Sequence, residues 1–219
     1  TVILFPFSIL TFILPFLDPI LNILILIMEY LVQLVSNIKA FTIILSRPNL
    51  IEIIIYYAIM TYVLCMFNKN RFFSLIYICL IIIIHYISSS FNPFIALTMI
   101  DVNQGDALLI RLPFNKGNIL IDTGGRLQLP IKEWSKRNKE YSLGSNTLIP
   151  YFKSLGIRSI DYLIITHGHD DHMGESIDLI NNFKVNKVIF NKANTTALEN
   201  KLINNLNNKH IPYFFYGEN

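Results

Sequence analysis

The chain has 219 residues, of which 53% are hydrophobic, and a formal net charge of +3. A charge this small does not by itself indicate a protein that binds nucleic acid or acidic partners. The charged residues are unevenly distributed, since seven of the 33 lie in residues 1–91 and the other 26 in residues 92–219. The positive mean hydropathy of +0.46 therefore averages an apolar half and a polar half. This excludes a chain that is soluble throughout.

Three long apolar runs, residues 20–38, 51–67 and 72–87, predict transmembrane helices in the first half. Each approaches the ~20 residues that a helix needs to cross a bilayer. None shows the polar face of a surface helix in a soluble protein. Residues 2–17 are also apolar but contain two prolines, so a spanning helix and a re-entrant segment both remain open. We therefore expect membrane helices in residues 1–91.

Basic residues in the loop between two of these runs predict the orientation of the chain. Lys69 and Arg71 lie in a short hairpin loop, and short basic loops usually face the cytoplasm. The helix that follows would then leave residues 92–219 outside the cytoplasm. Cys65 and Cys79 lie within the apolar runs at different depths, so no disulfide is expected between them.

The second half alternates between strand-like and helix-like segments. Strands are predicted where β-rich apolar runs are separated by turn residues, and helices where apolar residues recur with a helical period. The predicted strands are residues 95–102, 107–112, 117–121, 160–165, 187–190 and 211–215. The predicted helices are residues 146–155, 174–183 and 195–208. This alternation is typical of an α/β domain, a sheet covered by helices.

The fourth predicted strand leads directly into Thr-His-Gly-His-Asp-Asp-His at residues 166–172, which we call the histidine motif. Imidazole and carboxylate are ligands that divalent ions such as zinc prefer. His167 and His169, two apart on an extended turn, can point to one ion. Asp171 and His172 follow where the chain begins to coil and can face a second ion. The competing interpretation is a polar surface loop that is rich in histidine.

Four further motifs accompany the histidine motif. They are Asp-Val-Asn-Gln-Gly-Asp-Ala at 101–107, Ile-Leu-Ile-Asp-Thr-Gly at 119–124, Leu-Ile-Pro-Tyr-Phe-Lys-Ser-Leu-Gly-Ile at 148–157, and Ile-Asp-Tyr-Leu-Ile-Ile-Thr-His at 160–167. His-x-His-x-Asp-His after a strand resembles the signature of the metallo-β-lactamase superfamily. The motifs in this order resemble the C-terminal domain of ComEC-type DNA-internalisation (competence) proteins, closely over residues 95–190.

The resemblance implies a fold and a set of ligands. Residues 1–91 would be transmembrane helices at the end of a channel domain. Residues 92–219 would be the N-terminal part of a metallo-β-lactamase-like domain, a partial αββα sandwich. The complete domain would hold two divalent metal ions, zinc or manganese. The metal ligands implied in this sequence are His167, His169, Asp171 and His172.

The resemblance also implies a function in natural transformation. The chain would belong to a multi-pass plasma-membrane protein that takes up DNA, with DNA, the lipid bilayer and other competence proteins as partners. Its extracytoplasmic domain would be a metal-dependent nuclease acting on the strand that is not imported, with Asp171 as catalytic residue. One alternative is a channel component whose domain only binds or guides DNA. Another is a membrane-anchored hydrolase of small esters, so enzymatic activity remains open.

Two aspartates before the histidine motif could support it. Asp122 follows a strand, and the resemblance places its counterpart beside the metal loop, where a carboxylate can accept the free N–H of a metal-bound histidine. A simple turn cap is the alternative for this residue. Asp106 has the same claim, with a hairpin turn as its alternative.

The candidate ligand set is incomplete in this sequence. The resemblance implies a further histidine, a bridging aspartate and a final histidine downstream, but only His210 follows the histidine motif. We therefore expect a piece of a longer protein, one that binds metal weakly or as a single ion. His210 itself is interpreted as an ordinary surface histidine.

Two other polar features have alternative interpretations. Residues 126–145 are a polar insertion with several basic residues and one tryptophan. We interpret them as a solvated loop, with contact to a phosphate backbone as the alternative. His85 lies within an apolar run, where an ionisable side chain faces either the interior of a helix bundle or water at the interface.

Overall fold

The structure is a computed structural model that describes residues 4–36, 43–67, 71–88, 90–102, 104–125, 141–191 and 196–216. The chain divides into two compact units, Thr1–Ile43 and Ile44–Asn219, which are described separately. The change in composition near residue 92 falls within the second unit. The division of the chain at that point into a membrane segment and a catalytic-type domain remains a prediction.

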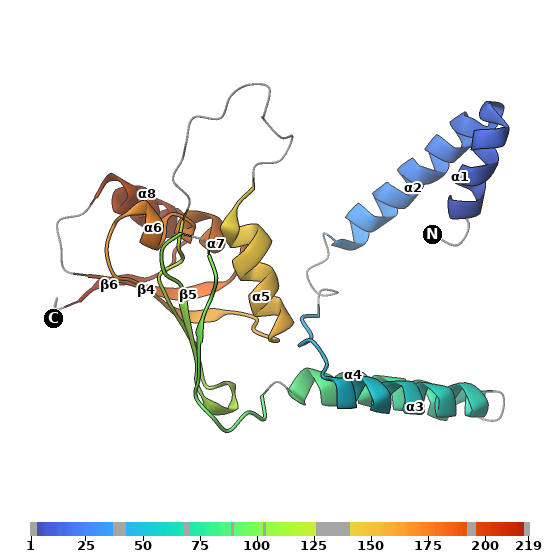
Figure 1. Ribbon diagram of the computed structural model, residues 1–219, viewed down its shortest axis with the longest axis horizontal. Coiled ribbons are helices and arrows are strands. Elements are labelled where there is room, and N and C mark those ends of the chain that lie inside the picture. Colours follow the sequence, from blue (N-terminus) through green and yellow to red (C-terminus); the bar gives the residue numbers. More distant parts are fainter. Residues whose placement is uncertain are drawn as a thin grey trace. The chain divides into compact units, whose positions relative to one another are not determined.

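The first unit consists of helices α1 (Leu4–Ile13) and α2 (Asp18–Ser36), joined by the 3-10 helix η1 (Pro15–Leu17). The helix α1 ends before Pro15 because proline lacks an N–H and its ring clashes with the preceding turn. In Figure 1, α1 folds back beside α2. The 10 residues of α1 give a length of about 15 Å, half the thickness of a bilayer core. Among the described residues, Pro15–Val35 is the segment long and apolar enough to cross a membrane.

The second unit begins with a pair of helices, α3 (Leu50–Phe67) and α4 (Arg71–Ser88), that pack side by side (Figure 1). Asn49 and Glu52 form a capping box at the start of α3, since each side chain accepts the backbone N–H of the other residue at 2.9 and 2.8 Å. Most apolar side chains of the pair are exposed. The apolar stretches of both helices are shorter than that of α2. Both predicted helices are confirmed, and their passage through a bilayer stays a prediction.

The rest of the second unit is built on one six-stranded sheet, whose strands lie in sequence order. The strands are β1 (Ala96–Met99), β2 (Leu108–Arg111), β3 (Asn118–Ile121), β4 (Ile160–Ile165), β5 (Val185–Phe190) and β6 (Tyr213–Phe215). The strands β1, β2 and β3 are antiparallel neighbours, and β4, β5 and β6 each run parallel to the strand before them. All six predicted strands are present, with β1 shorter and β5 longer than expected.

Four α-helices are found in the described residues of the sheet domain. They are α5 (Ile149–Ser154), which continues from the π-helix η5 (Gly144–Leu148), α6 (Asp170–Met173), α7 (Ser176–Asn182) and α8 (Ala197–Asn208); the 3-10 helix η3 (Pro113–Asn115) joins β2 to β3. Gly156 follows α5 with a φ of 75°, the left-handed conformation expected of a glycine after a helix. Thr196 begins α8 in a capping box with Glu199.

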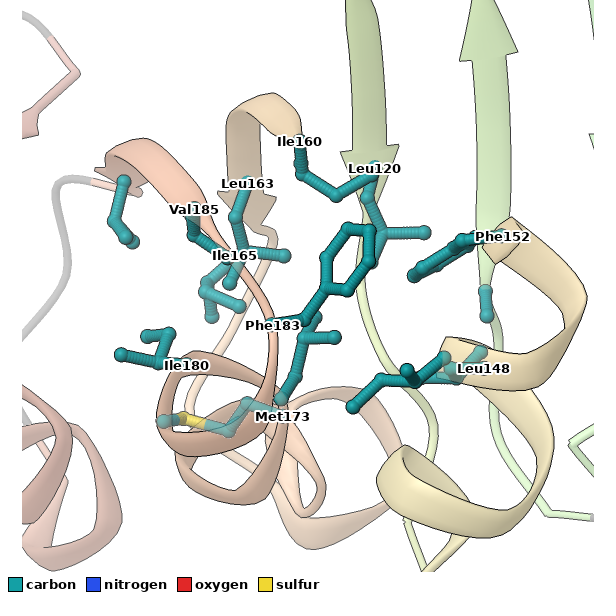
Figure 2. Packing of buried hydrophobic residues seen from close by; sticks show 14 of the residues in the cluster. Leu120, Leu148, Phe152, Ile160, Leu163, Ile165, Met173, Ile180, Phe183 and Val185 are labelled. Carbon is teal, nitrogen blue, oxygen red and sulfur yellow. The ribbon is translucent and has the colours of Figure 1, made fainter. Parts of the chain in front are cut away.

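The hydrophobic core lies between these helices and one face of the sheet (Figure 2). Leu120, Leu163 and Ile165 contribute from the strands, and each is fully buried. Phe152 of α5 packs against Phe183, with ring centroids 5.6 Å apart. Burial of large apolar side chains of this kind contributes about 1.5–3 kcal/mol each. This core holds the ends of the parallel strands in a fixed position.

The opposite face of the sheet carries an apolar row that crosses all six strands. The register aligns Met99, Leu108, Ile121, Ile164, Ile189 and Phe214. The two ends of the row, Met99 and Phe214, are 66% and 54% exposed, and the four residues between them are partly buried. Among the described residues of the sheet domain, the helices α5, α6, α7 and α8 lie over the other face (Figure 1). One sheet with one helical layer agrees with the expected partial αββα sandwich.

Candidate metal centre

The candidate site lies where the neighbouring parallel strands β3 and β4 end. Asp122 directly follows β3, and Thr166 directly follows β4. The backbone N–H of Asp122 donates to the carbonyl oxygen of Ile164 at 2.9 Å, and the backbone N–H of Thr166 donates to the carboxylate of Asp122 at 2.9 Å. Binding sites of open α/β sheets form at the carboxyl ends of the strands. The predicted position of the histidine motif, after a buried strand, is confirmed.

The histidine motif turns sharply into α6. His169 precedes this helix with an extended backbone (φ −95°, ψ 154°). Its carbonyl oxygen accepts the backbone N–H groups of His172 and Met173 at 3.1 and 3.0 Å. Met173 is fully buried and anchors α6 to the core. As a result, Asp171 and His172 turn back toward His167.

Three side chains of the motif come together as a cluster. The candidate ligand atoms of His167, Asp171 and His172 all lie within 4.8 Å of one another. The ring centroids of the two histidines are 3.7 Å apart, and Nε2 of His172 lies 3.6 Å from Oδ2 of Asp171. Both histidines are partly buried, whereas Asp171 is exposed. Two imidazoles and a carboxylate fit one divalent ion such as zinc and leave a coordination position for another ligand.

His169 lies outside this cluster. Its side chain is exposed, and its ring meets that of His167 edge-on, with centroids 4.9 Å apart. The sequence suggested His167 and His169 for one ion and the pair Asp171 and His172 for another. The structure groups His167 with the second pair because α6 begins immediately after His169 and reverses the direction of the chain.

Asp122 is buried beneath the cluster and is bonded to it. The residue is only 2% exposed. Its carboxylate oxygen Oδ2 accepts hydrogen bonds from Oγ1 of Thr166 (2.6 Å) and from Nδ1 of His172 (2.9 Å). Its φ of 56° lies in the left-handed region, which is uncommon for a residue other than glycine. Such conformations persist where surrounding bonds hold them, often at functional sites. Asp122 therefore contacts the histidine motif, as a supporting residue would.

Asp106 bonds through its backbone to the segment after β3. Its carbonyl oxygen accepts the N–H of Gly124 at 2.9 Å, and its residue is exposed. This bond joins Asp106 to the segment after β3, and the supporting role of Asp106 stays a prediction.

Two glycines permit a close approach of backbone segments that the sequence did not predict. A Cβ atom on Gly105 would lie 1.5 Å from the carbonyl oxygen of Asp171, and one on Gly125 would lie 1.7 Å from that of Asp170. Gly105 also has a φ of 80°, a backbone conformation that glycine adopts at low cost. The Gly-Asp pair at 105–106 was the available signal, and it indicated a turn without showing what the turn would contact.

The segment after β3 is joined to the helices that follow the motif. The backbone N–H of Thr123 donates to the carbonyl oxygen of His172 at 2.7 Å, and the backbone N–H of Glu175 donates to that of Gly124 at 3.3 Å. The hydroxyls of Thr123 and Ser176, both in fully buried residues, are 3.1 Å apart. These bonds fix the end of α6 and the start of α7 against the segment after β3.

A cleft of about 700 Å³ opens beside the cluster. His169 and Asp171 line it from the motif, Gln104 from the loop before β2, and Leu198 from the start of α8. Thr196 donates its hydroxyl to the carbonyl oxygen of Gly168 at 3.0 Å, so the start of α8 packs on the motif. The helix α8 was predicted from sequence, and this contact was not.

The other polar residues singled out in the sequence lie elsewhere. His85 is 6% exposed and bonds to the Tyr56 hydroxyl through Nδ1 (2.6 Å) and to the carbonyl oxygen of Ser46 through Nε2 (2.8 Å). It therefore faces its neighbours and not open solvent. His210 is exposed, as expected of a surface histidine. Residues 126–140 of the polar insertion lie outside the described part of the chain.

Comparison with known proteins agrees with this geometry. The family model described as the metallo-β-lactamase superfamily matches residues 100–213, which include strands β2 to β5 and the histidine motif. The chain is 28% identical to ComE operon protein 3 of Bacillus subtilis (strain 168) over 167 residues, which cover 74% of this chain and 22% of that protein. The chain thus spans about a fifth of the length of this relative, and the resemblance to ComEC-type proteins is confirmed. With more than half of its residues matched by the family model, the chain belongs to the metallo-β-lactamase superfamily.

Proposed function

We propose that this chain is part of a membrane protein that takes up DNA, and that its α/β domain is a metal-dependent nuclease acting on the strand that is not imported. The main support is the cluster of His167, Asp171 and His172, held at the carboxyl end of β4. The resemblance to ComEC-type DNA-internalisation proteins suggests DNA as the substrate. It also suggests the bilayer and other competence proteins as partners.

The residues of the site have distinct roles in this proposal. His167, Asp171 and His172 hold a divalent ion, zinc or manganese, and Asp122 orients the histidines. When bound, such an ion activates water near neutral pH and offsets charge on a phosphoryl oxygen. Asp171 is the exposed member of the cluster and lines the cleft. It is therefore the group best placed to meet both the phosphodiester and the attacking water, and we assign it the catalytic role.

A second ion would draw on His169 in the complete domain. This histidine lines the same cleft but stands outside the three-residue cluster. A pair of such ions would supply charge stabilisation to a phosphodiester during its hydrolysis. The described residues supply one ligand set, so the second ion requires ligands from other parts of the protein.

The alternative function is a domain that binds or guides DNA without cutting it. The position of His169 supports this alternative, because it leaves only one three-residue ligand set in the described residues. A single ion could then stabilise the loop or contact a phosphate without completing a two-metal hydrolase.

Cleavage of DNA by the full-length protein with Mn²⁺ or Zn²⁺ distinguishes the two functions. We expect His167→Ala and Asp171→Ala each to abolish cleavage. Asp170→Ala is the matched control, because Asp170 is the neighbouring exposed carboxylate outside the cluster. Full cleavage by the double variant His167→Ala/Asp171→Ala would refute the nuclease. DNA binding without cleavage in the metal-loaded wild type would establish the alternative.

The proposal also places the sheet domain outside the cytoplasm of a multi-pass protein. Its support is a basic pair in the sequence, Lys69 between α3 and α4 and Arg71 at the first position of α4. A cysteine introduced at the exposed Lys201 of α8, in a background with Cys65 and Cys79 replaced by alanine, should react with a membrane-impermeant thiol reagent on intact cells. Reaction only after the cells are lysed would place the domain in the cytoplasm.

A further inference from the structure

We propose that the hydroxyl of Thr166 is a positioning group that passes the orienting hydrogen bond of Asp122 on to His167. One buried carboxylate then fixes the ring tautomers of both histidines in the cluster, His172 directly and His167 through Thr166. The use of this arrangement in metal binding rests on the proposed function. Its geometry concerns this chain's own residues alone.

The hydrogen bonds form a continuous branched network. Oγ1 of Thr166 lies 2.6 Å from Oδ2 of Asp122 and 3.0 Å from Nδ1 of His167. Nδ1 of His172 lies 2.9 Å from the same Oδ2. The backbone N–H of Thr166 donates to the other carboxylate oxygen at 2.9 Å. Asp122 therefore contacts Thr166 twice and His172 once.

The direction of each bond follows from the available protons. A carboxylate only accepts, so the hydroxyl of Thr166 and Nδ1–H of His172 must both donate to Asp122. A hydroxyl has one proton, and that of Thr166 is used in this short bond. Its oxygen can then only accept from His167. His167 must therefore carry its proton on Nδ1, the same tautomer as His172.

This assignment leaves Nε2 unprotonated in both rings. Neutral Nε2 carries the lone pair that binds a metal ion. The cluster already holds Nε2 of His172 3.6 Å from Oδ2 of Asp171, with the two rings 3.7 Å apart. One ring nitrogen of each histidine and a carboxylate oxygen of Asp171 lie within 4.8 Å of one another. Second partners that orient ligating histidines in this way commonly improve metal affinity 10–100-fold.

Threonine suits this position for two reasons. Its branched side chain has restricted rotation about χ1, which keeps the hydroxyl between Asp122 and His167. Its place directly after β4 ties the backbone to the same carboxylate. Valine has nearly the same shape but no hydroxyl, and serine keeps the hydroxyl in a smaller side chain. These two replacements separate the hydrogen bond from the packing.

The tautomer can be read directly by ¹⁵N NMR of histidine-labelled full-length chain in detergent micelles, with metal removed by EDTA. The measurement is made at about pH 8.5, where imidazole is ordinarily neutral. Single histidine replacements assign the signals. We expect Nδ1–H for both His167 and His172 in the wild type. In Thr166→Val, His167 should shift toward Nε2–H while His172 keeps Nδ1–H through its own bond to Asp122. Thr166→Ser should restore the wild-type pattern.

The same variants should differ in metal binding. Chelator competition should show Zn²⁺ affinity reduced about 10-fold in Thr166→Val and nearly unchanged in Thr166→Ser. An Nε2–H signal from His167 in the wild type would overturn the proposal without the need for any variant. Unchanged tautomers in a folded Thr166→Val protein would overturn it as well.

The outcomes remain separate from those of the nuclease assay. The tautomers are measured without metal and without DNA, so a protein that never cleaves DNA can still confirm the relay. Conversely, active nuclease with an Nε2–H His167 would retain the proposed function and refute the role of Thr166.

Discussion

At each end of the parallel strands β3 and β4, an aspartate carboxylate accepts hydrogen bonds, but its donors differ between the two ends. At the carboxyl end, Asp122 joins the strands through a hydroxyl, an imidazole and one backbone N–H. At the amino end, Asp161 accepts the backbone N–H of Asn118 at 2.7 Å and the side-chain amide of Asn186 at 2.9 Å. Because amide protons have fixed positions, the bonds to Asp161 do not select among protonation states of its partners.

The partners of Asp122 are of another kind. The proton of an imidazole can sit on either nitrogen, and a hydroxyl proton can rotate. A carboxylate that contacts such groups selects among their states and thereby prepares them for a ligand. A carboxylate between two strands therefore does not by itself mark a binding site. The chemistry of its hydrogen-bond partners does.

The largest expected effect is on Zn²⁺ affinity, and it should differ between the two carboxylates. We expect Asp122→Ala to reduce Zn²⁺ affinity 10–100-fold, because both histidines lose the group that orients them. Asp161→Ala should leave Zn²⁺ affinity unchanged, although two hydrogen-bond donors lose their acceptor. Chelator competition on the two folded variants measures the difference. Equal losses at both positions would show that strand spacing alone controls the site.

Two glycines also differ between the two ends of these strands. Gly105 lies against Asp171 at the carboxyl end, with its φ of 80° and a would-be Cβ at 1.5 Å. Gly117 lies near the amino end, where a Cβ would meet a methyl group of Leu112 at 3.3 Å, the far end of a flexible side chain. We expect Gly105→Ala to destabilise the domain by more than ~1 kcal/mol and to weaken Zn²⁺ binding.

Gly117→Ala is the matched control. We expect its unfolding free energy to lie within about 1 kcal/mol of the wild type and its Zn²⁺ affinity to match. Urea denaturation and chelator competition on both variants provide the test. A harmless Gly105→Ala would mean that the loop before β2 can move away from the motif at little cost.

The smallest expected effect is at Asn186. Its side-chain amide donates one hydrogen bond to Asp161, in the partly buried surroundings of the amino end. Asn186→Ala should lower the unfolding free energy by about 0.5–1.5 kcal/mol, the usual net value of one such bond. Metal affinity should not change. A measurable loss of Zn²⁺ binding in this variant would indicate that the two ends of the sheet are coupled.

Hydrophobic runs and turn residues predicted that Asp122 and the histidine motif each follow a strand. The closeness of the two was implied by the family resemblance. The grouping within the motif did not follow, because it depends on where α6 begins. The contact of Gly105 with Asp171 joins residues distant in sequence, and no local pattern carries that information.

The helical elements show the same limit. The runs that became α3 and α4 were apparent from composition, while the first apolar run was ambiguous. Pro15 decides that case, since α1 ends before it and α2 follows after a short 3-10 turn. The sequence also indicated the strands without showing that β1 to β3 would be antiparallel and the rest parallel, because pairing is set by tertiary packing.

The apolar row on the open face of the sheet has a practical consequence for protein production. A contiguous apolar surface of this kind promotes self-association in water, so a sheet domain expressed from residue 92 should need detergent or a surface redesign. The substitutions Ile164→Thr and Ile189→Thr would preserve strand propensity and make the centre of the row more polar. The same replacements would harm any longer chain that packs a second layer there. Their effect on yield therefore reports whether this face is a surface or an interior.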